Sequence, residues 1–70
     1  MEWEQIVGAN IRRLRKERGL SQEALAGEAG LAMRHLGRIE RGEGNPTVAI
    51  LGKLAEVLDV LPTDFYAVGQ

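Results

Sequence analysis

The sequence predicts an all-α fold, a compact bundle of four to five short helices that forms a single domain over residues 1–70. Apolar residues recur at three- and four-residue spacings in several separate segments, as they do on one face of a helix. Turns rich in glycine or proline separate these segments, and connections of about two to six residues are too short for a long coiled coil. A chain of 70 residues has room for only one small core.

The first helix is predicted to begin near Trp3 and to end at Arg18. Its apolar residues fall at i, i+4, i+8 and i+11, with one more beside them, which is the stripe of an amphipathic helix. The stripe consists of Trp3, Ile6, Val7, Ile11 and Leu14. Gly19 can take the left-handed conformation that ends a helix, and the basic residues before it complement the helix dipole.

The second helix is predicted from Gln22 to Ala29. The Ser21 hydroxyl precedes it and can accept a hydrogen bond from an N–H group of the first turn. The helix stops at Gly30, where glycine can take the positive φ that turns the chain sharply. Leu31 is then expected to plug the turn.

The third helix is predicted from Ala32 to about Glu40. Met33, Leu36 and Ile39 are spaced three apart and form a face for packing, while basic residues occupy other faces. A helix, a tight glycine turn and a second helix together make a helix-turn-helix, a geometry used for DNA binding. Helical hairpins occur in many other proteins, so this pattern alone is weak evidence of function.

A fourth helix follows the turn at residues 42–46, with Thr47 as its N-cap and its end near Asp59. Its stripe consists of Val48, Leu51, Leu54, Ala55 and Leu58. Pro62 suits a first helical position, so Pro62–Ala67 is predicted to form a short fifth helix that presents Phe65 and Tyr66.

Positive charge is concentrated in the middle of the chain. The net charge is −1 and the isoelectric point is about 5.8. Residues 10–42 nevertheless carry eight cations and four acids, a net charge of +4, whereas both ends are acidic. A basic surface of this kind favours nucleic acid as the partner, although charged helices also occur simply as solvated faces.

Several classes of protein are disfavoured by what the sequence lacks. There is no cysteine and only one histidine, so neither a disulfide framework nor a metal site is expected. We find no candidate catalytic triad and no phosphate-binding glycine loop, so no enzyme, cofactor or small-molecule ligand is expected. No apolar run approaches the roughly 18 residues of a membrane span, and no basic signal start is present. A cytoplasmic protein is expected, associated with the nucleoid when it is bound to DNA.

Five stretches of the chain carry a family resemblance. They are Ile11–Ala26, Ala29–Leu31, Ile39–Gly42, Asn45–Thr47 and Leu54–Leu58. In order and spacing they resemble the lambda-repressor-like, xenobiotic-response-element family of helix-turn-helix regulators, and the resemblance covers about residues 6–66. It implies a sequence-specific transcriptional regulator that binds double-stranded operator DNA, with the helix at Ala32–Glu40 in the major groove. The alternative is an antitoxin-like or adaptor module that uses the same fold to bind protein.

The resemblance also implies roles for residues outside the third helix. Gln22 resembles the family residue that meets a DNA phosphate, with the free N–H groups of its helix nearby; the alternative is an ordinary exposed glutamine. Arg15 and Glu40 resemble a pair that joins the first helix to the end of the reading helix. Arg15, Arg41 and Asn45 are the other expected phosphate contacts, although Asn45 could simply shape its loop.

Base reading is expected from one face of the third helix. Arg34 and Arg38 favour guanine, because a guanidinium can donate two hydrogen bonds to guanine O6 and N7. Met33 either touches a thymine methyl group or packs into the domain. His35 and Gly37 are secondary positions: His35 is either a contact or incidental, and Gly37 either permits close approach to DNA or only weakens the helix. Ala32 replaces the usual hydroxyl cap, a loss of about 1 kcal/mol.

A homodimer is expected, because one short reading helix contacts only a few base pairs and a two-fold dimer reads two half-sites. The candidate interface is apolar and lies at the C-terminal end of the chain. It consists of Leu61, Phe65, Tyr66 and Val68. The same side chains could instead close the core of the monomer.

Overall fold

The computed structural model describes residues 1–68, so the last two residues of the expected 1–70 domain lie outside the described part of the chain. Residues 1–68 form four α-helices and one 3-10 helix, without a strand. The helices are α1 (Trp3–Glu17), α2 (Gln22–Ala29), α3 (Met33–Glu40), α4 (Val48–Leu58) and the 3-10 helix η1 (Pro62–Tyr66). The expected all-α fold is confirmed, and none of these helices is long and apolar enough to cross a membrane.

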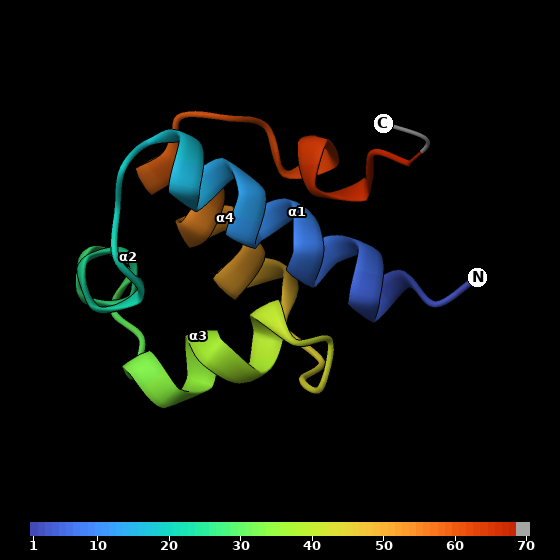
Figure 1. The fold of residues 1–70 in the computed structure, drawn as a ribbon, viewed down its shortest axis with the longest axis horizontal. Helices are drawn as coiled ribbons and strands as arrows, with labels where there is room; N and C mark the ends of the chain where they lie inside the picture. Colours follow the sequence, from blue (N-terminus) through green and yellow to red (C-terminus); the bar gives the residue numbers. More distant parts are fainter. Residues whose placement is uncertain (69–70) are drawn as a thin grey trace.

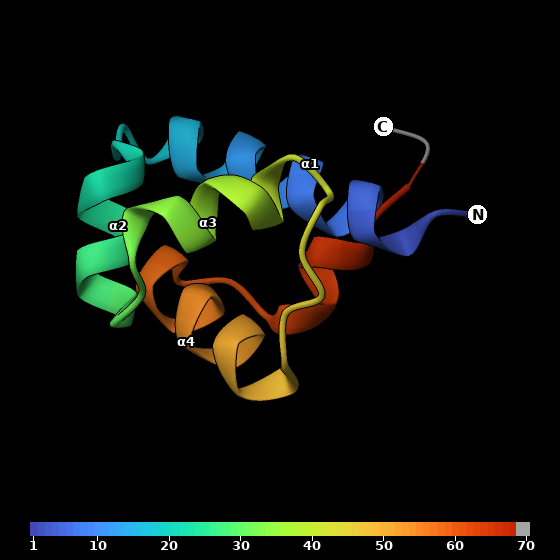
Figure 2. The same ribbon diagram turned by 90° about the horizontal axis from the view of Figure 1, so that it is seen from below.

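Helix α1 is the centre of the arrangement. It contacts α3, α4 and η1, while α2 contacts both α3 and α4 at one end of the bundle (Figures 1 and 2). Every helix contributes to one apolar core. The largest side chains in it are Phe65, Ile11, Leu25, Leu36, Ile39, Leu54 and Leu58, all of them fully buried. Burial of one face of each short helix therefore holds the helices together.

The four α-helices share the same C-terminal capping geometry. A residue with positive φ follows each helix, and backbone hydrogen bonds close over the last turn. These residues are Gly19, Gly30, Gly42 and Asp59. At the turn between α2 and α3, Gly30 has a φ of 76° and the N–H of Leu31 donates to the carbonyl of Ala26 over 2.8 Å. Leu31 packs against the core, so the predicted turn is confirmed.

Both predicted hydroxyl N-caps have the expected side-chain hydrogen bond. The Ser21 hydroxyl accepts from the N–H of Ala24 over 3.0 Å, and the Thr47 hydroxyl accepts from the N–H of Ile50 over 3.1 Å. Ala32, the N-cap of α3, has no side chain that could do this. The expected absence of a side-chain cap on the first turn of α3 is confirmed, and the helix begins at Met33, one residue after the predicted start at Ala32.

Three residues expected to pack are instead exposed. Trp3, Met33 and Val48 have exposed fractions of 46%, 52% and 87%. Each is the first residue of its helix. Because helical side chains lean towards the N-terminus, the side chain of a first residue points past the end of the helix and away from the core behind it.

Helices α1 and α3 approach each other closely at Gly8. A Cβ atom at this position would overlap the carbonyl oxygen of Ile39 and would lie 2.8 Å from that of Glu40. Both oxygens belong to the backbone and cannot move aside as a flexible side chain can. A residue without a side chain is therefore required for this contact, which brings the last turn of α3 against the first half of α1.

The chain after α4 folds back along α1. Residues Pro62–Tyr66 form a 3-10 helix rather than the predicted helix over Pro62–Ala67, and Phe65 fills the core. The buried Asn10 of α1 holds this segment, because its Nδ2 donates to the carbonyls of Phe65 over 2.7 Å and Ala67 over 2.9 Å. The role of Asn10 was not predicted, because its only signal in the sequence is a polar residue three positions after Val7 on the apolar face of α1.

Candidate nucleic-acid interface

Helix α3 presents a polar face to solvent and buries the other face. Leu36 and Ile39 are buried in the core, while Arg34, His35 and Arg38 are exposed. The alternative in which Met33 packs into the domain is wrong, because 52% of the residue is exposed. In Figure 1, α3 lies along the lower edge of the molecule, and in Figure 2, seen from below, it lies between α1 and α4. Four of the five expected base-reading residues therefore lie on an accessible surface.

Gly37 is the exception among these five residues. It is buried, and a Cβ atom built on it would lie 3.3 Å from Nη1 of Arg41 and 3.7 Å from Oε1 of Gln22. The expectation that Gly37 lies on the open neighbouring surface is therefore wrong. The small residue instead makes room for the Gln22 and Arg41 side chains, which lie across α3.

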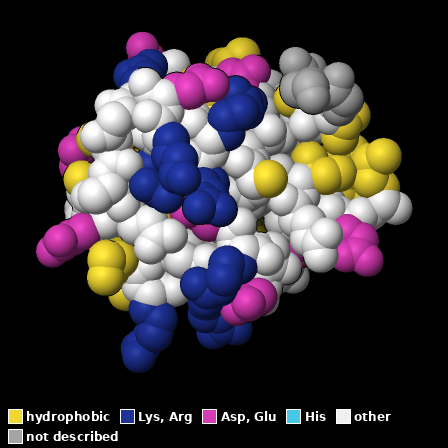
Figure 3. Space-filling model, in the orientation of Figure 1, with side chains coloured by type: hydrophobic (Ala, Val, Ile, Leu, Met, Phe, Trp, Pro, Cys, Tyr) yellow, Lys and Arg dark blue, Asp and Glu magenta, His cyan; other side chains and the backbone are white. Residues whose placement is uncertain are grey.

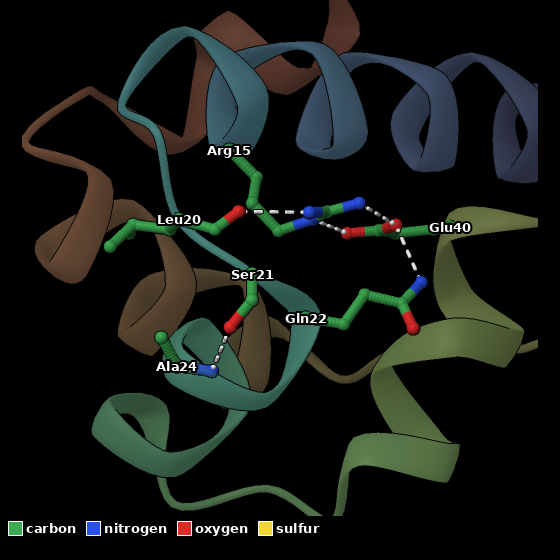
Figure 4. A network of polar contacts seen from close by, with 6 residues as sticks. All are labelled: Arg15, Leu20, Ser21, Gln22, Ala24 and Glu40. Atoms are coloured by element: carbon green, nitrogen blue, oxygen red, sulfur yellow. Dashed lines mark hydrogen bonds and ion pairs between the residues drawn. The ribbon is translucent and has the colours of Figure 1, made fainter.

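A buried polar network joins the first three helices (Figure 4). Arg15 of α1 donates through Nε and Nη2 to the two carboxylate oxygens of Glu40, over 2.7 and 3.0 Å. Its Nη1 donates to the carbonyl of Leu20 over 2.9 Å, and Gln22 of α2 donates through Nε2 to Glu40 over 3.0 Å. A bidentate arginine–carboxylate pair fixes distance and direction, so the network sets the angle at which α1, α2 and α3 meet.

The hydrogen bonds of this network occupy most of the Arg15 guanidinium group. Its side chain is 9% exposed, and three of its N–H directions are used by Glu40 and Leu20. The expected structural pair is therefore in contact, while most of the guanidinium is turned away from solvent. A direct phosphate contact by Arg15 stays a prediction, limited to the edge that lines the neighbouring hollow.

That hollow lies beside the network, where α1, α2 and the end of α3 meet. Its walls are formed by Arg12, Arg15, Gln22, Glu40 and Arg41. An open groove continues from it over α1 and is lined by Ala9, Arg12, Arg13, Lys16, Glu17 and Glu40. Figure 3 shows the corresponding face, with Lys and Arg side chains gathered over α1 in the centre and over α3 below. Three of the expected phosphate residues, Arg15, Gln22 and Arg41, thus line one basic hollow.

Arg41 also has an acidic partner, whereas Asn45, the fourth expected phosphate residue, lies elsewhere. Arg41 donates to both carboxylate oxygens of Glu43, over 3.2 and 3.3 Å. This hydrogen bonding, together with the charges of Arg41 and Arg38, holds the pKa of the exposed Glu43 carboxyl below its ordinary value. Asn45 is exposed and lines a separate, smaller hollow with Trp3 and neighbouring apolar residues. The structure does not bring Asn45 together with Gln22 and Arg41.

The candidate dimer surface is smaller than expected. Phe65 has no exposed area, so the interpretation of this side chain as an interface residue is wrong and its alternative, closure of the core, holds. Leu61, Tyr66 and Val68 are 67%, 43% and 48% exposed. The ring of Tyr66 lies beside that of Trp3, with 5.8 Å between their centroids. Hydrophobic side chains gather at this end of the molecule in Figure 3.

Within residues 1–68 there is no group of three or more histidine, cysteine or acidic side chains placed to hold a metal ion.

Arg12 was missed as a candidate, although it lines both the hollow and the groove. Its only sequence signal is a place one helical turn from Lys16 on α1.

Known proteins share this arrangement. A model of the helix-turn-helix family matches residues 11–65. The uncharacterized HTH-type transcriptional regulator y4dJ of Sinorhizobium fredii is 43% identical over 60 residues, which are 86% of this chain and 78% of that protein. HTH-type transcriptional regulator SinR of Bacillus subtilis is 43% identical over 56 residues, but this chain spans only half of its length.

Solved structures agree with the fold in detail. The restriction-modification controller protein C.AhdI from Aeromonas hydrophila superposes with a TM-score of 0.87 at 38% identity, covering 90% of this chain and 96% of that one. SinR, the master regulator for biofilm formation, was solved in complex with DNA; it superposes with a TM-score of 0.83 at 39% identity, covering 87% of this chain and 98% of that one.

Proposed function

This chain belongs to the helix-turn-helix family of transcriptional regulators, and we propose that it binds operator DNA by placing α3 in the major groove. One observation carries the proposal. Within residues 1–68, Arg34 and Arg38 of α3 are exposed and have neither an ion pair nor a side-chain hydrogen bond, whereas the opposite face of the helix is buried. The major groove is wide enough to admit an α-helix and displays a distinct pattern for each base pair.

Base reading is assigned to the exposed face of α3. Arg34 and Arg38 each donate two hydrogen bonds to a guanine, and every such pair contributes roughly 1–3 kcal/mol of discrimination against the wrong base. Met33 contacts a thymine methyl group, and His35 is a secondary contact. The accessibility of these side chains at one edge of the molecule supports the assignment.

Backbone positioning is assigned to the residues around α3. Gln22 and Arg41 face the same hollow and hold one phosphate there, supported by the free N–H groups at the start of α2. Asn45 contacts the backbone separately, beyond the end of α3. These contacts fix the register of the protein on the duplex and carry no sequence information.

Selection of bound duplexes from random DNA, followed by binding measurements on single variants, tests this function. Arg34→Ala and Arg38→Ala should each relax the base preference at one defined position of the selected site. Arg41→Ala is the control, because loss of a phosphate contact weakens all sequences about equally. Base preferences that survive both substitutions unchanged would contradict the assignment of α3 as the reading helix.

The salt dependence of binding distinguishes this function from its alternative. A protein that neutralises phosphates releases counterions, so the logarithm of its binding constant falls linearly with the logarithm of salt concentration. An antitoxin-like or adaptor module that binds only protein would show no such binding to either random or selected duplexes. The proposed DNA-binding regulator would act in the cytoplasm, at the nucleoid.

Pairing of two copies is the last part of the proposal. A homodimer would present two α3 helices to half-sites about one helical turn, or roughly 34–36 Å, apart. The exposed apolar side chains of Leu61, Tyr66 and Val68 support this assembly. Enzymatic activity and cofactors form no part of the proposed function.

A further inference from the structure

We propose that helix α1 forms a second phosphate-binding surface, made by Arg12 and Lys16 and continuous with the hollow that holds Gln22 and Arg41. The inference rests on the proposed function, because its ligand is the backbone of the same bound DNA duplex. It adds two exposed cations of α1, the helix that also carries the buried Arg15. It also predicts that the protein covers more of one DNA strand than the reading helix alone would reach.

The first argument is the pattern of ion pairs among the cations. Four arginines have acidic partners: Arg13 with Glu17, Arg15 with Glu40, Arg18 with Asp59 and Arg41 with Glu43. Within residues 1–68, Arg12 and Lys16 have neither an ion pair nor a side-chain hydrogen bond, and both are exposed. Their charges are therefore available to an external anion.

The second argument is position. Arg12 stands between the hollow of Gln22 and Arg41 and the groove over α1, because it lines both. Lys16 lines the same groove, one helical turn further along α1, at a rise of about 6 Å. Two cations at this spacing on one helix face can contact neighbouring phosphates of a single strand, as the strand passes from the hollow onto α1.

The third argument is that the acidic groups in this groove are neutralised. Glu40 lies at its base, but the side chain is only 2% exposed and forms a bidentate pair with Arg15. Glu17 is occupied by Arg13 over 3.1 Å. The groove therefore keeps the two charges of Arg12 and Lys16 without an opposing acid, and Figure 3 shows basic side chains over this part of α1.

Salt titrations of DNA binding test the inference. Affinities for a selected duplex and for a random duplex are measured at several salt concentrations for the wild type, Arg12→Gln, Lys16→Gln and the double variant. Each lost phosphate contact should reduce the slope of log K against log salt by about 0.9. Affinity at low salt should fall about three- to tenfold per substitution, equally for both duplexes.

Arg18→Gln is the matched control. It removes the same charge from the end of the same helix, but Arg18 is paired with Asp59 over 3.6 Å and lines neither the hollow nor the groove. Its slope should stay at the wild-type value. Circular dichroism melting curves check that all variants remain folded, which exposed substitutions should allow.

The possible outcomes separate the inference from the proposed function. Wild-type binding with a steep slope that is unchanged in Arg12→Gln and Lys16→Gln would overturn the inference and leave the function standing. An equal loss of slope in Arg18→Gln would also overturn it, because the effect would then reflect net charge rather than position. A wild type that binds no duplex would overturn the proposed function together with the inference.

Discussion

Two arginines on α1 show how burial changes the consequence of an ion pair. Arg13 and Glu17 lie 3.1 Å apart with 45% and 59% of their side chains exposed, so water screens both charges. Arg15 and Glu40 lie 2.7 Å apart with 9% and 2% exposed. Removing one partner from the exposed pair leaves a solvated ion. Removing one partner from the buried pair leaves a charge that neither water nor protein compensates.

Arg15→Met should therefore destabilise the protein by about 3 kcal/mol, because Glu40 would keep only the Gln22 amide as a partner. Arg13→Met should change the free energy of unfolding by less than about 0.5 kcal/mol. Urea denaturation of both variants measures the difference. The double variant Arg15→Met/Glu40→Leu should recover part of the loss. Equal effects of the two single substitutions would contradict the structural role of the buried pair.

At the scale of elements, α2 and α3 are equally long but begin differently. Each has eight residues, and Ser21 caps α2 with a hydrogen bond while Ala32 leaves α3 without one. Helix α3 also contains Gly37, which lowers its intrinsic helix propensity. A helix of this length has little stability of its own, so the conformation of α3 depends on the buried Leu36 and Ile39 and on the network at Glu40.

Ala32→Ser should stabilise the protein by about 1 kcal/mol, because a hydroxyl at this position can accept a hydrogen bond from the first turn of α3. The melting temperature of a domain of this size should rise by about 4–8 °C for that gain. Ser21→Ala is the reciprocal variant and should lower it by a similar amount. A melting temperature that stays unchanged in Ala32→Ser would show that the first turn of α3 is held by other contacts.

The molecule as a whole is polarised along α1. The start of α1 and the end of the described chain lie at the same end, and the turn between α1 and α2 lies at the opposite end (Figure 1). Exposed apolar side chains gather beside the termini, whereas exposed cations gather over the rest of α1 and over α3 (Figure 3). This separation lets one surface contact a second copy while another contacts DNA.

Leu61→Glu should convert a homodimer into a monomer, because it places a charge on an exposed apolar side chain of the candidate interface. Sedimentation measurements should show the mass of two chains for the wild type and of one chain for the variant. Val48→Glu is the control, since Val48 is 87% exposed and lies outside the candidate interface. A wild type that sediments as one chain, both free and on DNA with two half-sites, would contradict the proposed assembly.

Local signals account for what the sequence predicted correctly. The caps at Ser21 and Thr47 and the turn at Gly30 depend on neighbouring residues, so the helix boundaries follow from the sequence. The errors concern contacts between distant segments. The choice between an interface and the core for Phe65 stayed open, because its periodicity cannot reveal that Asn10, 55 positions away, holds this segment by a hydrogen bond.

In the candidate site, too, one feature could be predicted from the sequence, whereas others depend on the three-dimensional structure. The pairing of Arg15 with Glu40 came from a family pattern, whereas the isolation of Arg12 depends on where every acidic side chain points in three dimensions. The burial of Gly37 could not be predicted for a related reason. Its burial comes from the Gln22 and Arg41 side chains, which reach over α3 from neighbouring segments.

The close contact at Gly8 has a mechanical consequence. Because the α3 carbonyls of Ile39 and Glu40 rest against the α1 backbone, the last turn of α3 cannot move closer to α1 without overlap of backbone atoms. When a helix packed in this way meets a duplex, the duplex must supply part of the adjustment. Sequences that bend or twist easily will then bind better, even at base pairs that no side chain touches. The test replaces stiff base steps outside the reach of α3 with flexible ones and measures the change in affinity. Tighter binding to the flexible duplex would show that deformation of the DNA contributes to recognition.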